Sequence, residues 1–142
     1  MTSILLVEDT PADAELTLDA LREGTPNLTV DWVKDGAQAL DYLFGRAAYA
    51  ANPPPPPKVV LLDLRLPKVD GLQVLKALRE DPRTCCLPVV VLTSSREESD
   101  LVRSYQLGTN AYVVKPVDTE NFHQAVQTLR LFWTDLNHTR GE

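Results

Sequence analysis

Four apolar stretches of the sequence end in side chains that could take part in chemistry. The stretches are followed by Glu8-Asp9, by Asp63, by Thr93 and by Lys115. If they form strands of one parallel sheet, these side chains meet at its carboxyl edge, where open α/β sheets bind their ligands. Three carboxylates a few ångströms apart repel one another, so we expect a divalent cation to neutralise them. Oxygen ligands of this kind favour Mg²⁺.

The same side chains suit the transfer of a phosphoryl group to a carboxylate. Asp63 ends the central strand and would be the nucleophile, giving an aspartyl phosphate. Lys115 and Mg²⁺ would neutralise charge on the transferred group, and the hydroxyl of Thr93 would donate a hydrogen bond to it. Each residue alone has an ordinary explanation, such as a helix cap for Asp63 or a surface charge for Lys115. Their joint position after successive buried strands is the argument for chemistry.

Strand and helix patterns alternate along the chain and would position these residues. Short apolar runs are typical of strands buried on both faces, and amphipathic segments between them are typical of helices. The order predicts an α/β fold, a (βα)5 doubly wound sheet of five parallel strands covered by helices on both faces. The expected strands are Ile4–Val7, Leu28–Val33, Val59–Leu62, Pro88–Leu92 and Ala111–Val114. The expected helices run from Pro11 to about Gly24, over Gly36–Phe44, from Gly71 through Leu78, over Glu97–Leu107 and over Thr119–Leu136.

Length and composition restrict the function further. A chain of 142 residues suffices for one domain with one ordinary core. Its net charge of −6 disfavours binding to nucleic acid or to an anionic membrane. No apolar run approaches the ~20 residues that cross a bilayer, and the first residues do not resemble a signal peptide. Neighbouring cysteines such as Cys85-Cys86 rarely bridge, so we expect reduced thiols in a cytoplasmic protein.

Two other classes of protein place an acid or a phosphate at such strand ends. Phosphatases of the haloacid-dehalogenase type use a second aspartate two residues after the nucleophile. Here that position is Arg65, which cannot donate a proton near neutral pH. Flavodoxin-like cofactor binders cradle a phosphate in a loop rich in hydroxyls and glycine. Here that loop begins Glu8-Asp9-Thr10-Pro11, whose charge would repel a phosphate without a metal.

Four motifs together resemble those of the receiver domains of response regulators in two-component signalling. They are Val7-Glu8-Asp9, the segment Leu62–Pro67 with Asp70-Gly71, Val91–Ser94, and Tyr112–Pro116. The similarity covers essentially the whole chain. It implies the flavodoxin-like strand order 2-1-3-4-5 and a single receiver domain over residues 1–142 with no output domain. It also implies a phosphoacceptor signalling protein that catalyses only its own phosphorylation and dephosphorylation.

The resemblance implies a role for each residue at the strand ends. Asp63 matches the phosphoacceptor, and Asp9 and Asp63 match side-chain ligands of Mg²⁺. Arg65 matches the residue whose backbone carbonyl binds the metal, and Glu8 matches the second acid, acting through water.

Thr93 and Lys115 match the hydroxyl and the lysine that bind the phosphoryl group. Tyr112 matches the switch aromatic, which turns inward when Thr93 moves toward that group. A receiver-like module that binds partners without phosphorylation is the remaining alternative, and the filled phosphorylation positions argue against it.

A narrower resemblance is to stand-alone regulators paired with phytochrome histidine kinases. It rests on a Pro-rich insertion, on Ser104–Tyr112, on Pro116-Val117-Asp118 and on Phe132-Trp133. It implies a light-sensing histidine kinase as partner. Within the Pro-rich loop 47–58, the run Pro53–Pro57 favours polyproline II. This loop is either a stiff surface connection or a partner-binding segment.

The last expected helix carries two apolar residues, Leu131 and Phe132, that lie off its apolar stripe. They pack at the edge of the domain or form a homodimer surface. The run 137–142 is expected to be a polar tail.

Overall fold

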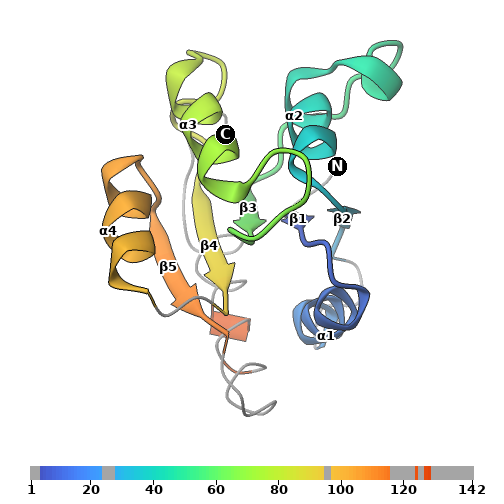
Figure 1. Ribbon diagram of the computed structural model, residues 1–142. Coiled ribbons are helices and arrows are strands. Elements are labelled where there is room, and N and C mark those ends of the chain that lie inside the picture. Colours follow the sequence, from blue (N-terminus) through green and yellow to red (C-terminus); the bar gives the residue numbers. More distant parts are fainter. Residues whose placement is uncertain (1–3, 24–27, 95–96, 116–123, 125–126, 129–142) are drawn as a thin grey trace.

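A five-stranded parallel sheet forms the centre of the computed structural model, which describes residues 4–23, 28–94, 97–115, 124 and 127–128 (Figure 1). The strand order is β2-β1-β3-β4-β5, as the resemblance implies, and all four pairings are parallel. The strands are β1 (Ile4–Val7), β2 (Val30–Val33), β3 (Val59–Leu62), β4 (Val89–Thr93) and β5 (Ala111–Val114).

The central strands are buried on both faces, as their continuous runs of Val, Ile and Leu predict. Every residue of β1, β3 and β4 is buried, whereas every residue of β5 is only half-buried. Successive side chains of a strand point to opposite faces of the sheet. Ile4 and Leu6 therefore belong to one core cluster, and Leu5 and Val7 belong to the other.

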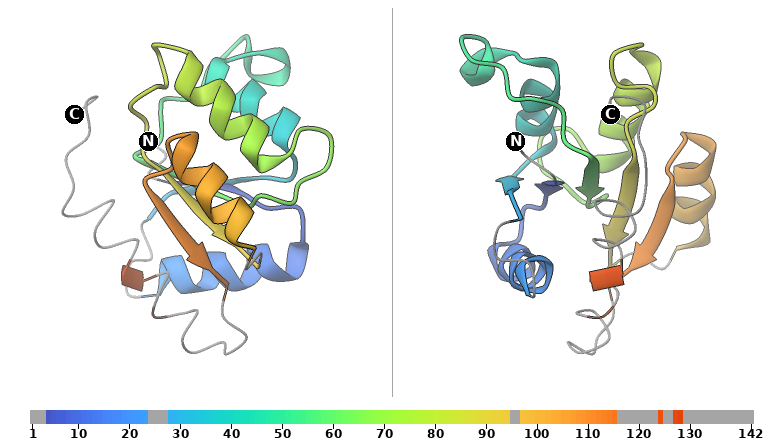
Figure 2. Two further views of the ribbon diagram at one scale, coloured as in Figure 1. Left: turned by 60° about the vertical axis from the view of Figure 1, so that its left-hand side comes forward. Right: turned by 180° about the vertical axis from the view of Figure 1, so that it is seen from behind.

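Helix α1 covers one face of the sheet, and α2, α3 and α4 cover the other (Figures 1 and 2). Ala14, Ala20 and Leu21 of α1 join the first core cluster, and the apolar side chains of α2 and α3 join the second. The helices are α1 (Pro11–Arg22), α2 (Gly36–Phe44), α3 (Gly71–Glu80) and α4 (Glu98–Gln106). None of the helices within the described ranges has the length and apolar character needed to cross a lipid bilayer.

The start of α3 is fixed against the end of β3. Asp70 caps the helix: its side chain accepts from Gln73 N at 3.1 Å, and the Gln73 side chain accepts from Asp70 N at 3.1 Å. This reciprocal capping box satisfies two backbone donors that the helix leaves open. A Cβ atom at Gly71 would lie 2.3 Å from the carbonyl oxygen of Asp63. Only glycine fits here, so the sequence Asp70-Gly71 sets how closely α3 approaches the residue after β3.

The structure differs from the sequence-based expectation at a few element ends. Strand β2 begins at Val30 rather than Leu28, and β4 extends to Thr93. A short 3-10 helix, Ala47–Tyr49, opens the Pro-rich loop and was not predicted. Its Tyr49 ring lies edge-on to Tyr42 of α2 with centroids 5.2 Å apart. The expected last helix lies almost entirely outside the described residues, and Leu131, Phe132 and the tail 137–142 lie wholly outside them.

Candidate functional site

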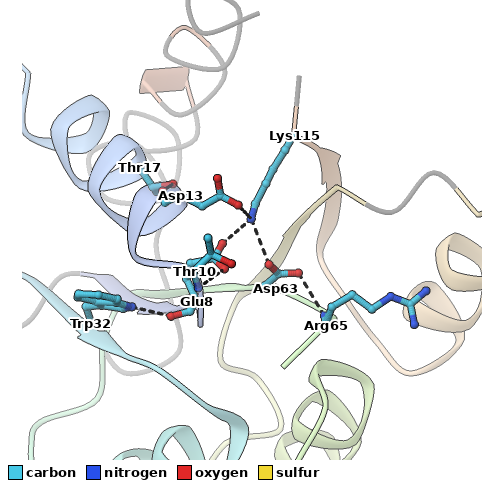
Figure 3. A network of polar contacts seen from close by, with 8 residues as sticks. All are labelled: Glu8, Thr10, Asp13, Thr17, Trp32, Asp63, Arg65 and Lys115. Atoms are coloured by element: carbon cyan, nitrogen blue, oxygen red, sulfur yellow. Dashed lines mark hydrogen bonds and ion pairs between the residues drawn. The ribbon is translucent and has the colours of Figure 1, made fainter. Parts of the chain in front are cut away.

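The residues after β1, β3 and β5 meet at the carboxyl edge of the sheet (Figure 3). Backbone pairing places them: Asp63 N donates to Val7 O at 3.1 Å, and Lys115 N donates to Thr93 O at 2.7 Å. The ends of four neighbouring strands are thereby brought level. Asp63 is largely buried, with 7% of its surface exposed.

Lys115 is the centre of the charge network. Its ammonium contacts the carboxylates of Glu8, Asp63 and Asp13, the last two at 3.1 Å. Figure 3 shows its side chain descending between α1 and the end of β3 with these acids around its tip. Burial alone would lower the pKa of Lys115, but its hydrogen bond to Glu8 and the charges of Asp63 and Glu8 outweigh this and raise it. Lys115 therefore remains charged.

Glu8 is an almost fully buried acid, with 2% of its surface exposed. Its carboxylate accepts from the backbone N–H of Thr10 at 3.2 Å, and its backbone carbonyl accepts from Trp32 Nε1 at 2.7 Å. Burial raises the pKa of Glu8 to about 7, with the charge of Asp63 acting in the same sense and the hydrogen bond from Lys115 opposing both. Three acids, Glu8, Asp13 and Asp63, thus share the single ammonium of Lys115.

The carboxylates at the end of the sheet fit a divalent cation. Glu8, Asp9 and Asp63 each offer a carboxylate oxygen, and the three atoms lie within 4.8 Å of one another. Asp9 is exposed and Glu8 is buried, so the group runs from solvent to the end of the sheet. Such all-oxygen ligands suit a hard ion such as Mg²⁺, which also keeps several waters. The backbone of Arg65 lies beside them, since its N–H donates to Asp63 Oδ1 at 3.2 Å.

The two expected switch residues lie on β4 and β5. Thr93 is the last residue of β4 and is fully buried, and Leu62, just before Asp63, pairs with Val91 two residues earlier. Tyr112 lies on β5, pairs with Val91, and is half-buried. Thr93 therefore ends the strand next to the one that Asp63 follows, and Tyr112 lies further back along the sheet.

Two members of the site were not predicted from the sequence. Asp13, in the first turn of α1, shares the ammonium of Lys115. The only feature of the sequence that could have indicated Asp13 is its place as an acid in a first helical turn. Such acids are usually explained by the helix dipole alone. Asp100 of α4 binds the guanidinium of Arg65, with Nη2 and Oδ2 2.7 Å apart. The two residues are 35 positions apart, and no sequence pattern connects them.

The fold and the site define a doubly wound parallel α/β protein whose acidic cluster and lysine lie at the carboxyl edge of the sheet, where such folds bind their ligands. Comparison with known families narrows the class: residues 4–127 match the response regulator receiver domain. The chain belongs to this family.

Individual relatives agree with the family match. The response regulator Rcp1 of Synechocystis sp. is 37% identical over 93% of this chain and 88% of its own. The phosphorylated cyanobacterial phytochrome response regulator RcpA superposes with a TM-score of 0.91 at 37% identity, covering 98% of both chains. The bacteriophytochrome response regulator AtBRR is 53% identical, with a TM-score of 0.76 over 97% of this chain and 99% of that one. The chain is thus similar to phytochrome response regulators in sequence and structure.

Proposed function

We propose that this receiver domain accepts a phosphoryl group on Asp63 from the phosphohistidine of a sensor histidine kinase. The observation that carries the proposal is the contact of one buried lysine, Lys115, with both Asp63 and Glu8, beside the exposed Asp9. The phosphorus–nitrogen bond of the donor breaks as a bond forms from phosphorus to a carboxylate oxygen of Asp63. The donor imidazole keeps the electron pair of the broken bond.

The residues around Asp63 have distinct tasks in this reaction. Lys115 offsets negative charge on the transferred oxygens, and the hydroxyl of Thr93 donates a hydrogen bond to one of them. Glu8, Asp9, Asp63 and the backbone carbonyl of Arg65 would hold Mg²⁺, with Glu8 acting through water. When bound, Mg²⁺ supplies a second positive charge that neutralises the phosphoryl oxygens. Rcp1 has been crystallised with Mn²⁺, at a TM-score of 0.89 and 35% identity to this chain, which supports a divalent ion here.

The partner we propose is a phytochrome-type, light-sensing histidine kinase. The similarity to RcpA and AtBRR, both described as phytochrome response regulators, supports this choice. We further propose a cytoplasmic protein whose residues 1–142 form one receiver domain. It signals through a change in its own surface, led by Thr93 and Tyr112, and the last helix region with Leu131 and Phe132 forms a homodimer contact.

Membership of the receiver family also bears on the rival functions. The haloacid-dehalogenase chemistry needs an acid two residues after the nucleophile, and the guanidinium of Arg65 at that position is engaged with Asp100. Flavin binding needs a loop that attracts phosphate, and the loop after β1 presents Glu8 and Asp9. A phosphoacceptor would use Glu8, Asp9 and the backbone of Arg65, whereas either rival function would use few of them.

Incubation with acetyl phosphate and Mg²⁺, followed by intact-mass analysis, tests the proposal. The wild type should gain one phosphoryl group, and Asp63→Asn and a sample with excess EDTA should gain none. Asp41→Asn, which alters an acid on α2 away from the site, should be labelled like the wild type. A wild type that stays unlabelled under conditions where it is folded would refute the proposal.

A further inference from the structure

The side chain of Arg65 connects the site to α4. Its backbone N–H donates to Asp63 Oδ1 at 3.2 Å, so its backbone is bound directly to the proposed phosphoacceptor. Its guanidinium lies elsewhere, with Nη2 2.7 Å from Asp100 Oδ2 and 3.7 Å from Glu97 Oε2. Figure 3 shows the side chain of Arg65 extending away from Asp63. One residue thus joins the loop after β3 to the start of α4.

Of the two acids, Asp100 is the main partner. Its side chain is 13% exposed, whereas that of Glu97 is 66% exposed. A largely buried carboxylate keeps its charge only with a cation or hydrogen-bond donors near it. An exposed acid at 3.7 Å contributes little, because water and salt screen the pair. Asp100 therefore decides where the guanidinium rests.

The ion pair borders a cavity that leads to the site. This cavity, of about 370 Å³, is lined by Asp9, the proposed metal ligand, and by Arg65 and Asp100, with the loop after β3 completing its wall. The Arg65 side chain is 62% exposed and lines this space. An exposed side chain can change its rotamer without displacing buried residues.

A phosphoryl group on Asp63 offers this guanidinium a second partner. It brings about two negative charges and three acceptor oxygens to a point beside the backbone of Arg65. Guanidinium groups bind such oxygens through paired N–H donors. The same cation cannot serve Asp100 and the phosphoryl group equally well at once.

We propose that Asp100 is a positioning residue that holds Arg65 on α4, and that a phosphoryl group on Asp63 competes for this guanidinium and thereby releases α4. The inference rests on the proposed function and adds a regulatory contact to it. Coupling of this kind is reciprocal: if phosphorylation weakens the hold on α4, removing that hold strengthens phosphoryl binding by the same factor.

Binding of beryllofluoride, a phosphoryl mimic, in the presence of Mg²⁺ tests this reciprocity. Calorimetric titration would compare wild type, Asp100→Asn, Arg65→Gln and the double variant. Because the Arg65 side chain is more than half exposed, we expect Asp100→Asn to bind the mimic only about 2- to 5-fold more tightly. This gain should vanish in the Arg65→Gln background, which a merely structural role of Asp100 would not produce. Glu97→Gln should give a smaller gain than Asp100→Asn.

Three results would overturn the inference: unchanged or weaker binding by Asp100→Asn, an equal gain with and without Arg65, or no release of α4. The last is measured on the wild type, which needs no variant to fold. Amide hydrogen exchange over residues 98–106 should become faster when beryllofluoride is added, and Arg65→Gln should exchange fast from the start. A wild type that acetyl phosphate labels but that shows no such coupling defeats this inference alone. A wild type that is neither labelled nor binds the mimic defeats the proposed function.

Discussion

The centre of the sheet and its β5–α4 edge differ in how deeply their residues are buried. Every residue of β1 and β3 is buried, and Glu8 and Asp63 follow directly after these strands. At the edge, β5 is half-buried, α4 buries only Asp100 and Ser104, and Leu101, Val102 and Tyr105 are 38%, 47% and 52% exposed. The proposed nucleophile and the buried acid thus follow fully buried strands. The side chains that would transmit a signal lie at the more exposed edge.

A pair of leucine truncations should show this difference most strongly. Leu62→Ala removes a side chain with 0% exposure from β3 and should cost about 2–5 kcal/mol in free energy of unfolding, because it leaves a cavity in the core. Leu101→Ala on α4 should cost less than about 1 kcal/mol, as exposed substitutions do. Urea unfolding followed by circular dichroism measures both. Equal losses would contradict the contrast between centre and edge.

Removing the central cation should abolish most of the chemistry. Lys115→Met leaves Glu8, Asp13 and Asp63 without the ammonium that they share. We expect the rate of labelling by acetyl phosphate to fall about 100-fold, the usual effect of losing one preorganised charge from a reacting group. Lys115→Arg keeps the charge and should recover part of the rate. Circular dichroism confirms that each variant is folded, and a Lys115→Met protein labelled at the wild-type rate would remove Lys115 from the mechanism.

The tight approach of α3 to the site gives a prediction with a matched glycine control. A Cβ at Gly71 would meet two backbone atoms, Asp63 O at 2.3 Å and Leu64 Cα at 2.6 Å. Gly71→Ala should therefore cost about 1–3 kcal/mol, as overpacking does, and slow the labelling of Asp63 by moving its backbone. Gly45→Ala places alanine at a φ of 64°. It should cost about 1 kcal/mol, since left-handed backbone strains alanine, and leave labelling unchanged. Similar labelling rates for the two variants would show that α3 does not position Asp63.

Glu8, in the buried centre of the sheet, should also give a pH dependence of stability. Its pKa is raised by burial from 4.5 to about 7, so the folded protein retains a proton that the unfolded chain has already lost. A raised pKa contributes stability that is complete below pH 4.5 and is lost as the pH rises through about 7. Unfolding of wild type and Glu8→Gln in EDTA, measured from pH 4.5 to 8, should show the wild type losing stability relative to the variant. If the difference in unfolding free energy between the two proteins stays constant from pH 4.5 to 8, the pKa of Glu8 is not raised in the folded protein.

The sequence predicts the centre of the molecule better than its edge, for a physical reason. A strand buried on both faces must be apolar throughout, so β1, β3 and β4 were recognisable, and their polar ends indicated Glu8, Asp9 and Asp63. The strand order 2-1-3-4-5 followed from the resemblance and is confirmed.

Contacts that depend on tertiary placement could not be predicted. Asp13 reaches Lys115 only because α1 begins beside the end of β5, and Asp100 reaches Arg65 only because α4 lies beside the loop after β3. Neither spacing carries a local signal. The 3-10 helix at Ala47–Tyr49 likewise has a tertiary contact, between the rings of Tyr49 and Tyr42.

The most direct test of the account is to locate the phosphoryl group after labelling with acetyl phosphate and Mg²⁺. Peptide mass spectrometry of the labelled protein should find the group on Asp63, and none on Glu8, Asp9 or Asp13. Asp63→Asn should carry no label at any acid of the site. Label on another residue in the wild type, or undiminished label on Asp63→Asn, would contradict the claim that Asp63 is the phosphoacceptor.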